Sequence, residues 1–242
     1  MIRYGRNVNL KESTEYFVGD YQEVIERFSS RRDLGVEINE EGTFTEHIKN
    51  ICKKVRQKSG WILRSFYTRE AEFMRHMFKT LVQPHIDYCS QLWMPHEAQN
   101  LEKMEKLLKD YTRKIPGTVG LNYWERLSKL KMNSEQRRLE KYQVNYIWKI
   151  MEGLTPNCGG NWSGTEERNE RACKIPPLKG RSSVQTLRNQ SFQVSGPRLF
   201  NSMPKIIRNM KNCSLEDFKC QLDIFLNKGS SRNAPEMGIK TY

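Results

Sequence analysis

The order of hydrophobic and polar positions predicts a short β-rich start. Apolar residues alternate with polar ones on both sides of Gly19-Asp20, which predicts a β-hairpin with its turn at that pair. A third short strand is expected at residues 34–38, followed by a turn at residues 39–42. We therefore interpret residues 1–44 as one segment of short strands.

From residue 45 onward the apolar positions repeat at helical spacing. Thr45 is the predicted N-cap of a first helix. One apolar stripe follows this helix, formed by Ile48, Ile51, Cys52, Val55 and Ile62. Further helices are predicted at residues 69–82, 101–115, 123–130 and 134–151. Pro84 should break or restart the first of these, and the segment 45–152 is interpreted as one helical domain.

The character of the chain changes after residue 152. Gly and Pro recur through residues 153–182, which is typical of a loop or linker. In residues 183–228 we expect an α+β extension, with short strands in 183–194 and a last helix capped by Ser214. Residues 229–242 are interpreted as a flexible tail. The predicted fold class is mainly α: a helical bundle with a small N-terminal β-hairpin or meander and a short C-terminal α+β extension.

The composition adds a strong positive charge. Lys and Arg number 41 and Asp and Glu number 28, so the formal net charge is +13 over 242 residues. Residues 171–212 contain nine basic residues and no acidic one. Such a segment cannot neutralise its own field, which favours a polyanionic partner such as nucleic acid. A solvated surface that only keeps the protein in solution is the alternative explanation.

Several classes of protein are disfavoured by the sequence. It has no apolar stretch of the length a membrane span needs and no apolar region of a signal peptide in its first residues. We therefore expect a cytoplasmic or nuclear protein that is neither secreted nor bound to a membrane. The six cysteines form no CxxC pair, as is typical of reduced thiols. His85 and Cys89 have i, i+4 spacing but supply two ligands where zinc needs three or four, so no metal site is predicted.

The residues themselves predict no catalytic centre. Walker loops, dinucleotide fingerprints, HExxH and GxSxG are absent from the sequence. Asp87 and Asp110 have no second carboxylate beside them, whereas a two-metal polymerase or nuclease needs clustered carboxylates.

Five segments follow one another in an order that matches a known family. They are RRDLGVEINEEGTFTEHI (Arg31–Ile48), FKTLVQPHIDYCSQLWMP (Phe78–Pro95), NYWERLSKLKMNSEQRRLEKYQVNYIWKIMEG (Asn122–Gly153), SFQVSGPRLFNSMPKII (Ser191–Ile207) and SLEDFKCQLDIFL (Ser214–Leu226). Together they resemble the C-terminal part of the reverse transcriptases of jockey-like non-LTR retrotransposons. In one departure, Phe200 stands where the family usually has Trp before Asn.

The resemblance implies a polymerase fragment without its catalytic centre. Residues 1–44 would be the end of the palm, residues 45–152 a helical thumb and residues 153–242 a C-terminal extension. The family's two metal-binding aspartates lie in an [FY]xDD turn upstream of the segment corresponding to Arg31–Ile48, and this chain has no such motif. The endonuclease domain of the family is expected to be missing as well. We therefore expect no enzymatic activity and no cofactor in this chain, since magnesium would belong to the missing palm site.

The expected partner is RNA or an RNA–DNA hybrid, bound mostly without sequence specificity, with the missing palm and fingers domains as further partners. A thumb grips the duplex by its phosphates, so its contacts should be cations away from the apolar stripe. The first candidates are Lys49, Lys53, Lys54, Arg56, Lys58 and Arg64. The second candidates are Arg137, Arg138 and Lys141, and the third are Arg181, Arg188 and Arg198. For each of them, a solvated surface cation is the alternative.

Aromatic residues could add base stacking. The candidates are Tyr88, Trp93, Trp124, Trp148 and Phe200. Helical spacing favours core packing for Trp124 and Trp148, whereas Trp93 is the more open case.

Two other interpretations stay open. The fragment could complete a polymerase supplied in trans or belong to a longer product, and an upstream reading frame with the missing aspartates would support this. It could also be a non-functional remnant or a helical bundle reused for protein contacts. Aggregation on expression without rescue by RNA would support that reading.

Overall fold

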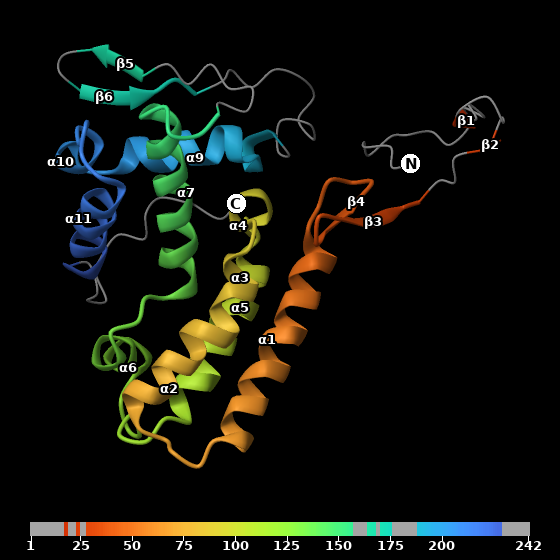
Figure 1. The fold of residues 1–242 in the computed structure, drawn as a ribbon, viewed down its shortest axis with the longest axis vertical. Coiled ribbons are helices and arrows are strands. Elements are labelled where there is room, and N and C mark those ends of the chain that lie inside the picture. Colours follow the sequence, from red (N-terminus) through yellow and green to blue (C-terminus); the bar gives the residue numbers. More distant parts are fainter. Residues whose placement is uncertain are drawn as a thin grey trace. The chain divides into compact units, whose positions relative to one another are not determined.

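In the described residues the protein is mainly helical, which confirms the predicted class (Figure 1). The computed structural model describes residues 17–18, 23–24, 28–156, 164–167, 170–175 and 188–228. The chain forms two compact units, residues 1–51 and 52–242, so the predicted extension and all of the predicted thumb except residues 45–51 lie in the second unit.

The first unit contains two β-hairpins. Strand β1 (Phe17–Val18) pairs antiparallel with β2 (Glu23–Val24), as predicted, while the expected turn pair Gly19-Asp20 lies outside the described residues. Strand β3 (Ser30–Asp33) pairs antiparallel with β4 (Val36–Asn39).

The predicted strand at residues 34–38 is wrong at its first two positions. Leu34 and Gly35 form a two-residue turn between Asp33 and Val36, with φ of 44° and 88°. Two successive left-handed residues are what a tight hairpin turn with the right-handed strand twist requires. The sequence pattern also missed β3, because its four residues are all exposed and show no apolar alternation. The turn expected at residues 39–42 is present, since the Gly42 N–H donates to the Asn39 carbonyl at 3.0 Å.

Helix α1 (Thr45–Ser65) contains the boundary between the two units. It begins one residue earlier than predicted, because Thr45 is already helical and the Ile48 N–H donates to the Phe44 carbonyl at 2.9 Å. The predicted apolar stripe is confirmed, with Val55 and Ile62 completely buried. In the first unit, the Asn50 side-chain amide donates to the Glu37 carboxylate at 2.7 Å, which ties this end of the helix to β4.

The second unit continues with a series of helices. They are α2 (Ala71–Met77), the π-helical turn η1 (Phe78–Val82), α3 (Gln83–Asp87), α4 (Ser90–Trp93), α5 (Ala98–Arg113), α6 (Tyr123–Leu130) and α7 (Glu135–Met151). Pro84 lies in the first turn of α3, directly after the wider π-helical turn, so it restarts the helix. The predicted limits of α6 and α7 agree with the structure because Asn122 and Ser134 act as N-caps.

The C-terminal part of the second unit differs from its prediction in two places. Residues 153–182 are not only a loop, because β5 (Gly164–Glu167) and β6 (Glu170–Cys173) form an antiparallel hairpin. Residues 192–194 are not a strand but the start of α9 (Phe192–Ser202), and residues 183–187 lie outside the described part. Two further helices, α10 (Lys205–Arg208) and α11 (Leu215–Lys228), complete the described chain.

Packing against α7 explains why these segments depart from the local pattern. Helices α7, α9 and α11 share one apolar core, in which the Trp148 and Phe218 rings stack with centroids 4.6 Å apart. Cys173 of β6 is buried in the same core. Helix α9 approaches α7 closely at Gly196, where an added Cβ would lie 3.0 Å from Ile147 Cδ1. The predicted thumb and the predicted extension are therefore joined by a common core.

The last helix starts as predicted. The Ser214 hydroxyl accepts a hydrogen bond from the Asp217 N–H at 3.1 Å, which makes it the N-cap of α11. Within the described ranges, no helix has both the length and the apolar composition needed to cross a bilayer.

Candidate nucleic-acid interface

The exposed face of α1 in the second unit carries most of the first candidates. Its exposed cations are Lys53, Lys54, Arg56, Lys58 and Arg64. The core-facing positions Val55 and Ile62 fix which side of the helix points outward, because side chains three, four or seven positions apart share a face. Residues 52–69 contain no Asp or Glu, and no ion pair in the described part of the chain involves these five cations. Their charge is therefore available to an anion.

A shallow groove of about 490 Å³ lies beside this face. It is lined by Lys54, Gln57, Lys58 and Trp61 of α1 and by His85 of α3. The four α1 residues follow i, i+3, i+4, i+7 spacing and therefore share one side of the helix.

Trp61 provides an aromatic surface within this groove. Its side chain is 47% exposed, while its ring makes an edge-to-face contact with Phe66 at 5.7 Å. Phe66 in turn contacts Phe73 of α2 at 5.3 Å. The ring is thus supported on one side and open on the other. A supported aromatic ring next to lysines is the combination with which proteins bind nucleic acid strands, the ring stacking on a base and the lysines contacting phosphates.

His85 adds a neutral polar group. Burial and the positive charges of Lys58 and Lys54 lower the pKa of His85 below its ordinary value. The imidazole is therefore uncharged at neutral pH and can both donate and accept a hydrogen bond.

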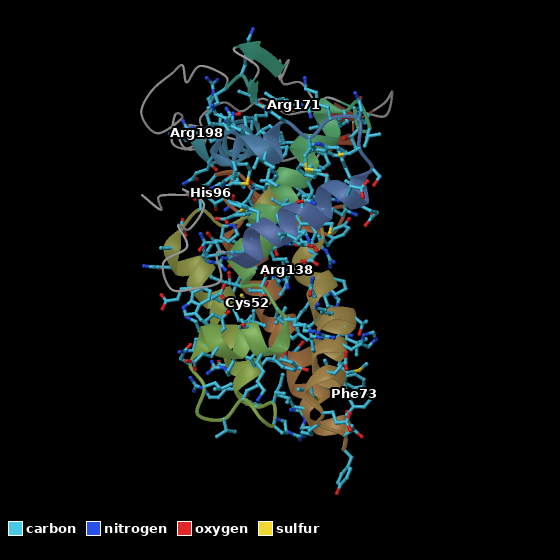
Figure 2. All side chains as sticks on the ribbon, turned by 90° about the vertical axis from the view of Figure 1, so that its left-hand side faces the viewer. Cys52, Phe73, His96, Arg138, Arg171 and Arg198 are labelled. Carbon is cyan, nitrogen blue, oxygen red and sulfur yellow. The ribbon has the colours of Figure 1, made fainter. Side chains whose placement is uncertain are left out.

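Other cation candidates lie elsewhere. Lys49 belongs to the first unit and forms an exposed ion pair with Glu46 at 2.9 Å. Arg188 and Arg198 are exposed, and Figure 2 shows Arg198 far from Phe73, the residue that lies near the C-terminal end of α1. Arg181 lies outside the described residues. Neither Arg188 nor Arg198 lines the groove at Trp61.

The expected phosphate contact at Arg138 is wrong, because this side chain is buried among carboxylates. Its Nε lies 3.1 Å from Asp87 Oδ1, and its Nη2 donates to Glu135. A buried cation that is paired with two carboxylates has no free face for a phosphate. Lys141 is half-buried and contacts both oxygens of Asp223 at 2.5 and 2.6 Å.

Arg137 differs from these two residues. Its guanidinium group lies 5.5 Å from the centroid of the half-buried Trp124 ring, within cation–π range.

Most of the predicted stacking residues are in the core. Trp93, for which the sequence left stacking and core packing undecided, is completely buried, and its Nε1–H donates to the Tyr88 carbonyl at 2.8 Å. Trp148 and Phe200 are also completely buried. Tyr88 is 53% exposed and stays a candidate for base stacking. Trp61 was missed, although its position away from the apolar stripe and three residues after Lys58 is a signal that the sequence contains.

The pair that suggested metal chemistry is not arranged on one helix. Helix α3 ends at Asp87, and Cys89 has a left-handed backbone with φ of 52°. Among the described residues, His, Cys, Asp and Glu form no group of three or more that could hold a metal ion.

Comparison with family models, with curated proteins and with solved structures found no match for this chain. Membership of the reverse transcriptase family is therefore a proposal that depends on the five sequence motifs.

Proposed function

We propose that this protein binds RNA or an RNA–DNA hybrid without sequence specificity through the exposed face of α1. The observation that carries the proposal is the groove in which Trp61 lies beside Lys54 and Lys58, on a helix segment without acidic residues. In this proposal the chain is a reverse transcriptase remnant that holds nucleic acid and does not polymerise. Magnesium would belong to the palm site of the parent enzyme.

Contacts of lysine with phosphate and stacking of Trp61 on a base affect the salt dependence of binding differently. A lysine that neutralises a phosphate releases a condensed counterion, so each such contact adds about 0.7 to 0.9 to the slope of log K against log salt. Stacking of Trp61 on a base releases no counterion. It contributes about 1–3 kcal/mol, equivalent to a loss of about 5- to 140-fold in affinity on truncation.

The experiment measures binding of the full chain to a fluorescent single-stranded RNA and to an RNA–DNA hybrid over a series of salt concentrations. The double variant Lys54→Gln, Lys58→Gln should bind more weakly and reduce the salt slope by about 1.5. Trp61→Ala should weaken binding of the RNA about tenfold and leave the slope unchanged. The matched control is Lys106→Gln with Lys114→Gln, which removes the same charge from exposed positions of the α5 region outside the groove.

The control variant shows whether the groove or the total charge of the chain accounts for nucleic-acid binding. If the control variant weakens binding as much as the groove variant, the net charge of +13 accounts for binding and the proposed interface is wrong. Nucleotide incorporation by the wild-type chain in the presence of magnesium would contradict the proposed remnant.

A further inference from the structure

A second cavity in the same unit shares no lining residue with the α1 groove. It has a volume of about 470 Å³ and lies among η1, the end of α6, α7 and α11. Four cations line it, Lys79, Lys131, Arg138 and Lys141, together with a single carboxylate, Asp223. The volume is within the range of small-molecule sites, which is roughly 300–1,000 Å³.

Two of the four cations are already compensated. Lys141 contacts both oxygens of Asp223, and Arg138 is paired with Asp87 and Glu135 behind the cavity wall. Lys79 and Lys131 have no acidic partner among the described residues. The cavity therefore contains two uncompensated positive charges, which come from different walls, η1 and the residue after α6.

The charges of these walls interact. Burial lowers the pKa of Lys79, and the positive charges of Arg75, Arg138 and Lys141 lower it further, while Asp223 acts in the opposite direction. A bound anion would relieve this crowding of like charges.

The remaining walls suit an organic group and are held in place. Leu127 and Met132 line the cavity, and the small part of each side chain that stays accessible, 2% and 8%, is apolar. Tyr142 is fixed by its hydroxyl, which donates to Asp87 at 2.7 Å. Lys131 is fixed at its backbone, because its N–H bonds to the carbonyls of the last turn of α6.

We propose that this cavity binds a small phosphomonoester, with the dianionic phosphate between Lys79 and Lys131 and the organic part against Leu127, Met132 and Tyr142. Two negative charges match the two uncompensated ammonium groups, and the volume leaves space beyond the phosphate. The proposal is independent of nucleic-acid binding by α1.

Titration calorimetry with the full chain tests the proposed binding of a phosphomonoester. The probe is adenosine 5′-monophosphate, and adenosine and inorganic phosphate are the comparison ligands. We expect saturable binding of the monophosphate below about 1 mM, weaker binding of inorganic phosphate and none of adenosine. Lys79→Gln and Lys131→Gln should each weaken binding about tenfold, as expected for the loss of one charge-assisted contact. Lys106→Gln is the charge-matched control and should bind as the wild type does.

Four results would overturn the proposal. The first three are equal binding of adenosine and its monophosphate, an equal loss in the Lys106→Gln control, and the absence of saturable binding by the wild type. The variant Lys54→Gln, Lys58→Gln should keep its affinity for the monophosphate. Loss of affinity in that variant would move the ligand to the α1 groove and would also contradict the assignment to this cavity.

Discussion

Glu135 provides the sharpest test of the energetics of this fold. It is the first residue of α7 and is completely buried. Burial raises the pKa of Glu135 to about 7; the negative charges of Glu105 and Asp87 also raise it, and Arg138 opposes them. The structure thus predicts a carboxyl group that is protonated in the folded protein at pH values where it is ionised in the unfolded chain.

The sign and size of the effect follow from linkage. The folded state binds the proton of Glu135 more tightly than the unfolded chain does. The stabilisation of the folded state by this proton is therefore complete below pH 4.5 and is lost as the pH rises through about 7. The difference between the two pKa values corresponds to about 3 kcal/mol of unfolding free energy, because each unit is worth about 1.4 kcal/mol.

The substitution Glu135→Gln removes the titration and keeps the size of the side chain. Urea unfolding between pH 4.5 and pH 8 should show that the wild type loses about 3 kcal/mol more than the variant over this range. The matched control is Glu216→Gln, which removes an exposed carboxylate from the first turn of α11 and should follow the wild-type pH dependence. The histidines are common to all three proteins, so their titration cancels in the comparison.

A variant that keeps the wild-type pH dependence would refute this account of Glu135. So would a variant that is much less stable than the wild type at pH 8, because the ionised pair with Arg138 would then be a net stabilising contact.

Two further predictions concern helix packing and capping. Gly196→Ala should reduce the unfolding free energy by about 1–3 kcal/mol, because its Cβ would lie 3.0 Å from Ile147 and 2.9 Å from the Phe192 ring. An increase in urea stability, as expected where the methyl group fits, would contradict this. Ser214→Ala should cost about 1 kcal/mol through loss of the hydrogen bond from the Asp217 N–H, and Ser214→Asn should restore most of it in the same assay. Equal stability of the alanine and asparagine variants would show that the cap contributes little.

The limits of α6 and α7 and the start of α11 were predictable because their signals are local. The limits of α6, α7 and α11 follow from caps that lie within three residues of the groups they bond, at Asn122, Ser134 and Ser214. The buried stripe of α1 follows from helical periodicity alone. The same periodicity places its lysines on the outer face, which is why the cationic part of the candidate interface could be predicted.

The errors occur where distant residues decide the outcome. The short strands expected in residues 183–194 overlap the first three residues of α9, whose apolar side chains pack against α7. The local sequence gives no sign that Arg138 differs from the surface cations beside it. One of the carboxylates that pair with it is Asp87, which lies on α3, far from Arg138 in the sequence.

The sequence by itself therefore determined the helical class, the limits of α6 and α7, the start of α11 and the basic face of α1, since each depends on residues within a few turns of one another. The tertiary structure alone decided which cations are free and which aromatic rings are open. Lys141 meets Asp223 across 82 residues, and Tyr142 meets Asp87 across 55. Such pairs depend on how helices pack, and local periodicity carries no information about the partner that a polar side chain meets.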